Sequence, residues 1–68
     1  MNLEDLQHIF KPQLEQSQDQ NILLFYMLND GDHMVINRHP ATDMESLLPL
    51  LSSFEYRGSD ANIPRFVK

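Results

Sequence analysis

The side chains that could act as nucleophiles in this chain are mainly hydroxyls, because the sequence contains no cysteine. They are Ser17, Thr42, Ser46, Ser52, Ser53 and Ser59. None of them lies in a Gly-x-Ser-x-Gly or a Ser-x-x-Lys pattern, two arrangements that activate a serine. A serine also needs an adjacent base and an oxyanion pocket, and a chain of 68 residues has little volume to enclose both. We therefore do not expect an enzyme.

Metal ligation has no suitable set of side chains either. His33 and His39 lie six residues apart on an expected strand, so they would face the same way but about 20 Å apart, too far to share one ion. The Asp-Gly-Asp of residues 30–32 resembles part of a calcium loop, but aligning its glycine with that of the loop puts Tyr26 and Leu28 at ligand positions. We expect no metal and no other cofactor.

The charge balance narrows the class of partner. Ten acids against five bases give a net charge of -5, which disfavours direct nucleic-acid binding because phosphate contacts need clustered Lys and Arg. The longest apolar run, Ile22–Leu28, is far shorter than the ~20 residues that span a bilayer. The N-terminus carries acids where a secretory signal carries bases, and the absence of cysteine suits a reducing compartment. We expect a cytoplasmic protein without a membrane segment.

A helix is expected at the start of the chain, where apolar residues recur every three or four positions. These are Leu3, Leu6, Phe10 and Leu14. Asn2 can cap the first turn, and Pro12 predicts a kink or a restart. After a polar connector, Ile22–Leu28 reads as a strand, Asp30 and Gly31 as a two-residue turn, and residues 33–37 as the returning strand of an antiparallel hairpin.

A second helix follows Pro40. Thr42 and Glu45 have the spacing of a capping box, and the apolar residues after them fall on one face. Pro49 either kinks this helix or lies in the first turn of a regular part that begins near Ser46. We expect the helix to end before Gly58, a plausible C-terminal cap, so residues 1–58 form one small α+β domain in the order α-β-β-α. The hairpin packs against the two helices, and residues 59–68 form an extended tail, ordered or disordered.

The hairpin has more apolar surface than one core can use. A two-residue turn pairs Tyr26 with Val35 and Phe25 with Ile36. The expected inner face carries Leu23, Phe25, Met27, Met34 and Ile36, and the expected outer face carries Ile22, Leu24, Tyr26, Leu28 and Val35. An outer strand face is normally polar, so we expect something to cover this apolar face. The cover is the tail folded back, a helix, or another protein chain.

These features favour a small acidic protein-binding module, a regulatory, adaptor or inhibitor protein that acts through the outer hairpin face and forms a homodimer or a hetero-complex. A strand added by a second chain would also satisfy the free edges of the hairpin. The expected contact residues are Leu24, Tyr26, Leu28, Val35, Tyr56 and Phe66. Tyr26 is the expected anchor, because an aromatic ring with a polar tip suits an interface. The alternative function is a structural subunit of a larger assembly, such as a phage particle component.

Overall fold

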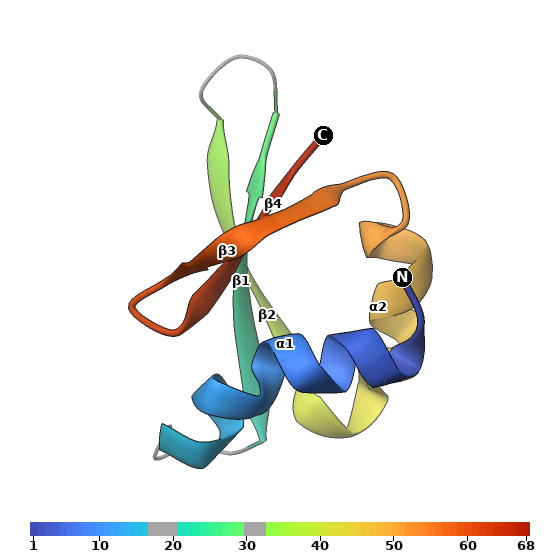
Figure 1. The fold of residues 1–68 in the computed structure, drawn as a ribbon, viewed down its shortest axis with the longest axis vertical. Helices are drawn as coiled ribbons and strands as arrows, with labels where there is room; N and C mark the ends of the chain where they lie inside the picture. The colour runs from blue at the N-terminus through green and yellow to red at the C-terminus, as the bar shows by residue number, and fades with distance from the viewer. Residues whose placement is uncertain (17–20, 30–32) are drawn as a thin grey trace.

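The computed structural model describes residues 1–16, 21–29 and 33–68. The elements in chain order are α1 (Leu3–Gln16), β1 (Ile22–Leu28), β2 (Met34–Pro40), the 3-10 turn η1 (Ala41–Asp43), α2 (Met44–Leu51), β3 (Glu55–Asp60) and β4 (Ile63–Val67). The strands form one sheet in the order β2-β1-β4-β3 (Figure 1). β1 runs antiparallel to β2 and parallel to β4, and β3 is antiparallel to β4. The expected α+β class and the order α-β-β-α are confirmed.

The end of the chain is a second hairpin where a helix end and a tail were expected. α2 stops at Leu51, and β3 and β4 add two strands to the sheet. Gly58, with φ +88°, lies in β3 where the register with β4 shifts, a backbone conformation open to glycine. Ala61 and Asn62 both have positive φ and form the two-residue turn between the strands. The reading of Gly58 as a helix cap is therefore wrong.

The start of α1 is capped as expected. The Asn2 side-chain oxygen accepts from the Asp5 N–H at 2.9 Å, and the Asp5 carboxylate accepts from the Asn2 N–H at 3.2 Å. This reciprocal pair satisfies free donors of the first turn. Pro12 lies inside α1, which continues to Gln16 without a restart.

The start of α2 differs from the expected capping box. Within the described residues no side-chain hydrogen bond caps α2, and Thr42 lies in η1, one residue before the N-cap Asp43. The Ser46 hydroxyl instead donates to the Asp43 carbonyl at 2.8 Å. The helix begins at Met44, so Pro49 lies in its interior.

The core lies where both helices meet the inner face of the sheet. Its buried side chains are Leu6 and Phe10 of α1, Leu23 and Phe25 of β1, Met44, Leu47 and Leu51 of α2, and Phe66 of β4. Phe10, Phe25 and Phe66 form a triangle with ring centroids 6.3–6.5 Å apart. Rings at such distances gain contact energy beyond the area they bury. The second hairpin has a physical reason, because its Phe66 completes a core that residues 1–58 leave open.

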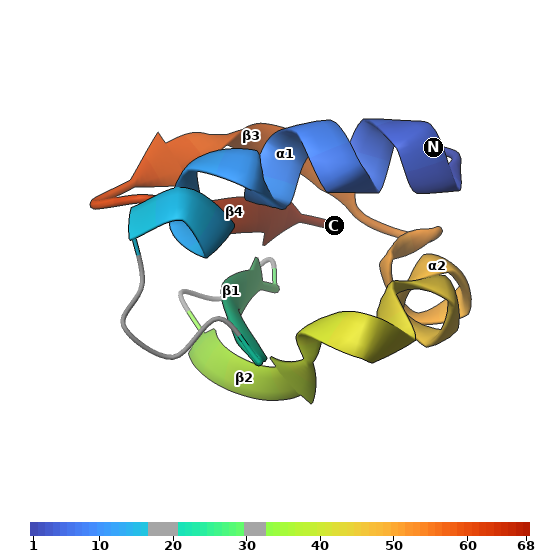
Figure 2. The same ribbon diagram turned by 90° about the horizontal axis from the view of Figure 1, so that it is seen from below.

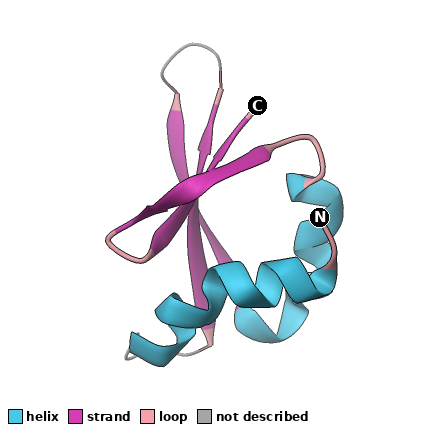
Figure 3. Ribbon diagram, viewed as in Figure 1, coloured by secondary structure: helices cyan, strands magenta, loops and turns pink. Residues whose placement is uncertain are grey.

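The two hairpins cross in the twisted sheet, and the helices lie near only one end of the β1–β2 hairpin (Figure 3). The end of β1 and the start of β2 lie away from α1 (Figure 1). Among the described residues, no helix is long and apolar enough to cross a membrane.

Candidate protein-binding surface

The alternation along β1 separates two faces as the sequence predicts. Leu23 and Phe25 are fully buried against the helices, whereas Leu24, Tyr26 and Leu28 remain partly exposed on the other side of the sheet. Successive residues of a strand point to opposite faces, so those three side chains form one row. The structure thus brings together three of the six predicted contact residues.

The pairing of β2 differs by one residue from the expected register. Tyr26 pairs with Ile36, Met27 with Val35, and Leu28 with Met34. The pairing extends to the loop, where the Asn29 N–H donates to the His33 carbonyl at 3.3 Å. Three residues, 30–32, therefore lie between Asn29 and His33, the last bonded pair of the hairpin. The predicted Asp30–Gly31 turn lies outside the described residues.

This register exchanges the faces of β2, because a shift of one residue turns every side chain over. Val35 shares the inner side with Met27, although it is 48% exposed because it lies toward the end of the hairpin away from the core. Met34 and Ile36 are on the outer side, 61% and 54% exposed. The predicted place of Val35 on the outer face is wrong, and Met34 and Ile36 lie there beside Tyr26 instead.

The C-terminal residues enlarge this surface instead of covering it. Phe66 is 0% exposed in the core, so it is not available as a docking anchor, and the prediction for it is wrong. Tyr56 pairs with Phe66 on the inner side, with the ring centroids 5.6 Å apart, and is only 37% exposed. Along β4, Ile63 and Val67 alternate with the buried Pro64 and Phe66, and both are partly exposed on the outer side.

We call the resulting surface the outer face. Its apolar members are Ile22, Leu24, Tyr26, Leu28, Met34, Ile36, Ile63 and Val67. Both helices give their buried side chains to the other side of the sheet, and α2 lies to one side of β1 and β2 (Figure 2). The last turns of α1 border the outer face, where Gln13 and Gln16 line a hollow with Leu24 and Ile63. Apolar side chains gathered on one exposed face of a sheet are typical of an interaction site.

Charged groups lie on both sides of the sheet. Arg38 lies opposite Leu24 and Arg65 lies beside Tyr26, so both guanidinium groups are at the outer face. The helical side carries the acids Glu4, Asp5, Glu15, Asp43 and Glu45. The described ion pair joins Arg57 and Glu55 of β3 at 3.2 Å, and both side chains are mostly exposed. Glu55 and Asp60 of β3 pair with Val67 and Ile63, so these two acids also lie on the outer side. A partner of the outer face therefore meets apolar side chains interspersed with charges of both signs.

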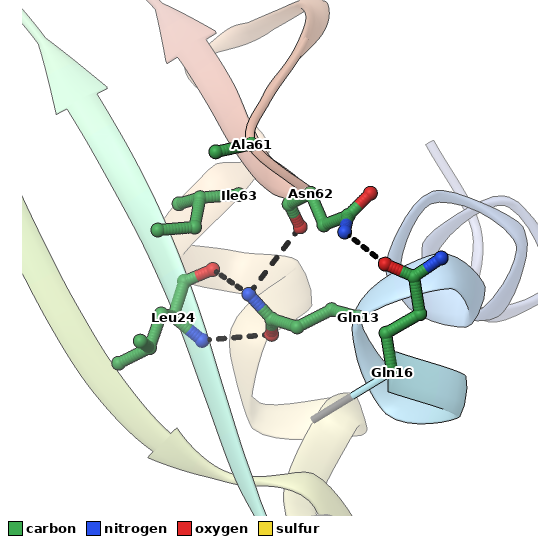
Figure 4. A pocket seen from close by; sticks show the side chains of 6 residues that line it. All are labelled: Gln13, Gln16, Leu24, Ala61, Asn62 and Ile63. Carbon is green, nitrogen blue, oxygen red and sulfur yellow. Dashed lines mark hydrogen bonds between the residues drawn. The ribbon is translucent and has the colours of Figure 1, made fainter. Parts of the chain in front are cut away.

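A buried glutamine connects the back of this surface to α1. The Gln13 side chain is 7% exposed, and its amide accepts from the Leu24 N–H and donates to the Leu24 carbonyl, both at 2.9 Å (Figure 4). A longer contact of 3.5 Å reaches the Asn62 carbonyl. β4 pairs with β1 only from Tyr26 onward, so the Leu24 backbone would lack a neighbouring strand there. Gln13 supplies the donor and acceptor that a strand would have supplied.

The hollow beside Gln13 is lined by groups that already bond to one another. It measures about 280 Å³ and also includes Gln16, Leu24 and residues 61–63. The Asn62 side-chain amide donates to the Gln16 side-chain oxygen (Figure 4). Because these polar groups hold the turn and the helix together, we interpret the hollow as structural.

The contact nearest to a catalytic pair is between Ser46 and His39. The Ser46 hydroxyl oxygen lies 3.0 Å from His39 Nε2, and His39 Nδ1 lies 3.0 Å from the Pro40 carbonyl. Both side chains are at the surface, and the hydroxyl also donates to the Asp43 carbonyl at the start of α2. A local role in joining β2 to α2 accounts for these bonds.

No group of three or more metal-ligating side chains occurs in the part of the chain that the structure describes. Sequence reasoning did not find Met34, Ile36 or Gln13. The first two were missed because of the register, and Gln13 was missed because a single Gln on a helix carries no signal of burial. In comparisons with known proteins, no family, no curated protein and no solved structure matches this chain.

Proposed function

We propose that this protein is a small cytoplasmic protein-binding module whose outer face docks onto another protein chain. The observation that carries the proposal is the outer face itself, a row of apolar side chains that includes Met34 at 61% and Ile36 at 54% exposure. Apolar area removed from water contributes roughly 25 cal/mol per Å², so covering such a surface favours association.

Tyr26 is the anchor of this proposal. It lies on the central part of β1, between Leu24 and Leu28 on its own strand, with Ile36 opposite and Arg65 on the other side. An aromatic ring among aliphatic neighbours buries a large area, and its hydroxyl can bond at the edge of a partner. A regulatory, adaptor or inhibitor role fits a module with one such face.

The position of Phe66 supports a module over a structural subunit held by its tail. A tail that locks into a neighbouring subunit needs free apolar anchors, but Phe66 is buried in its own core and residues 63–67 are a strand of its own sheet. Pro64 is also fully buried. These residues therefore stabilise the fold of this chain itself.

Photo-crosslinking at matched positions tests the proposal. A photoreactive phenylalanine analogue replaces Tyr26 on the outer face, or the exposed Gln7 of α1 as a control, in cells that produce the protein naturally. We expect a discrete crosslinked protein from the Tyr26 position and none from the Gln7 position, because only the outer face is docked. Equal crosslinking at both positions, or none at Tyr26, would contradict the proposal.

A further inference from the structure

One edge of the sheet is a free, regular strand. β2 is the first strand in the order β2-β1-β4-β3, so no described strand pairs with its other side. Its register with β1 is continuous over seven residue pairs, from Ile22 with Pro40 to Leu28 with Met34. A straight edge of this length offers unpaired backbone groups to another strand.

The hydrogen bonds at the two ends of the hairpin identify those groups. Asn29 donates to the directly opposite His33, and Ala41 donates to the directly opposite Asn21. In an antiparallel pair, bonded and non-bonded positions alternate. The odd-numbered residues of β2 therefore bond to β1, and the N–H and C=O groups of Met34, Ile36 and Arg38 point to the free edge.

The other edge of the sheet is protected in a way that β2 is not. β3 carries Glu55, Arg57 and Asp60, a register shift, and a glycine with positive φ. Charges and bulges on an edge strand prevent it from pairing with another strand. β2 instead begins with Met34, Val35 and Ile36, and its proline lies at its last position.

The exposure of these first residues of β2 involves both faces of the sheet. Met34, Val35 and Ile36 are 61%, 48% and 54% exposed, although Val35 points to the side opposite its neighbours. A partner on the outer face alone would leave Val35 uncovered. A strand added beside β2 would contact side chains on both faces at once.

We propose that β2 pairs in antiparallel fashion with β2 of a second copy of this chain, around a two-fold axis at Ile36. Ile36 then lies opposite Ile36 of the second copy, and Met34 lies opposite Arg38. Each free N–H and C=O of Met34, Ile36 and Arg38 has a partner in this register. This inference rests on the proposed protein-binding function and names a second copy of the chain as the partner. Its β2 pairs with β2 of the first copy, and the outer face is then continuous across the two copies.

The distribution of charge fits a second copy. β2 carries no acid, the acids of β3 lie at the opposite edge of the sheet, and Arg38 is the one Lys or Arg residue of β2. The two Arg38 residues are four positions apart along the joined strands, about 13 Å at 3.3 Å per residue. This exceeds the Debye length of about 8 Å at physiological ionic strength, so their repulsion is screened. The aliphatic part of each Arg38 can cover Met34 of the other copy.

Residue-resolved amide hydrogen exchange, measured at a series of protein concentrations, tests the pairing. The amides of Met34, Ile36 and Arg38 should exchange fast at low concentration and progressively more slowly as the mass measured by light scattering rises from one 8.0 kDa chain to two. The amides of Val35 and Asn37 should be protected at every concentration, because they bond to β1. A dimer in which the three even-numbered amides stay fast would overturn the edge pairing.

Two substitutions at Ile36 separate the backbone from the side chain. Ile36→Pro removes the free N–H at a position where an edge strand tolerates proline, and should give a monomer with an unchanged circular dichroism spectrum. Ile36→Thr keeps the N–H and the β-branch, and should still dimerise with a dissociation constant raised on the order of ten- to a hundredfold. If Ile36→Pro does not fold, a synthetic chain with an N-methyl group on Ile36 replaces it.

The outcomes distinguish this proposal from the proposed function. A wild-type chain that stays monomeric at every concentration, or an Ile36→Pro chain that still dimerises, would overturn the edge pairing. Crosslinking of a different protein at Tyr26 would in that case still support docking on the outer face. A dimer that is lost in Ile36→Pro but crosslinks to nothing else would establish the second copy as the partner.

Discussion

Replacing Gln13 by leucine should destabilise the protein although it makes a buried helix position more apolar. The substitution removes the donor and the acceptor that bond the Leu24 N–H and carbonyl at 2.9 Å. Leaving a buried polar group unsatisfied costs about 1–3 kcal/mol, and Leu24 is partly exposed, so water can offset part of the loss. The N–H and the carbonyl together therefore cost about 2–6 kcal/mol, and water and the gain from burying a leucine offset roughly half of this, so we expect a net loss of about 1–3 kcal/mol. For a chain of this size, whose total stability is roughly 3–10 kcal/mol, this loss is large.

Urea unfolding followed by circular dichroism measures this loss, with Gln7→Leu as the control. Gln7 is exposed on the same helix, and glutamine and leucine have similar helix propensity, so the control should change the free energy of unfolding by less than about 0.5 kcal/mol. The slope with urea should be unchanged in both variants, since the same surface is exposed on unfolding. A Gln13→Leu variant as stable as the control would refute the role given to Gln13.

Gln13→Glu adds a dependence on pH with a defined sign. An ionised carboxylate can accept from the Leu24 N–H, but its second oxygen would face the carbonyls of Leu24 and Asn62. Burial beside carbonyl oxygens raises the pKa of this carboxyl in the folded state above its unfolded value of about 4.3. The folded state is therefore favoured below that unfolded value, and the advantage is lost as the pH rises through the folded pKa. Relative to wild type, the variant should be least impaired in acid; an equal deficit at all pH values would contradict the bonding shown.

Three further predictions test the fold. Phe66→Ala should cost about 3–5 kcal/mol and largely unfold the chain, which calorimetry would show as a lost transition, whereas a normal melt would place Phe66 outside the core. Ala61→Gly should raise the free energy of unfolding by about 0.5–1 kcal/mol, because Ala61 has φ +51° and glycine avoids that strain; a lower midpoint in urea would contradict it. In this cysteine-free chain, Leu28→Cys with Met34→Cys should form a disulfide that mass spectrometry detects, whereas Leu28→Cys with His33→Cys should not, and the reverse result would restore the two-residue turn.

Local patterns predicted the first half of the fold well. The spacing of apolar residues located α1, the Asn2 cap formed, and the alternation in β1 correctly separated Phe25 from Tyr26. Each of these features depends on neighbours a few residues away. The register of β2 depends on the length of the loop, and one additional residue there moved Val35 to the other face.

The second hairpin could not be predicted in the same way. β4 contains Pro64 and Arg65 between its apolar residues, which reads as an irregular tail, and its parallel pairing with β1 joins residues almost forty positions apart. The role of Gln13 depends on that pairing, because Leu24 lies before the first bonded pair of β1 and β4, Tyr26 with Arg65. The candidate surface was therefore found on β1 and missed on β2 and β4.

The most direct test of docking through the outer face is Tyr26→Asp, with Gln7→Asp on α1 as the control that adds the same charge. An uncompensated carboxylate in an apolar interface loses its hydration, so Tyr26→Asp should abolish association. The monomer should keep its fold, because Tyr26 lies on the side away from the core. Size-exclusion chromatography with light scattering, run on each variant mixed with the protein that crosslinks at Tyr26 and beside circular dichroism, should show a folded Tyr26→Asp chain free of that protein and a Gln7→Asp chain bound to it. A Tyr26→Asp chain that associates like wild type, or one that unfolds, would contradict a docking role for the outer face.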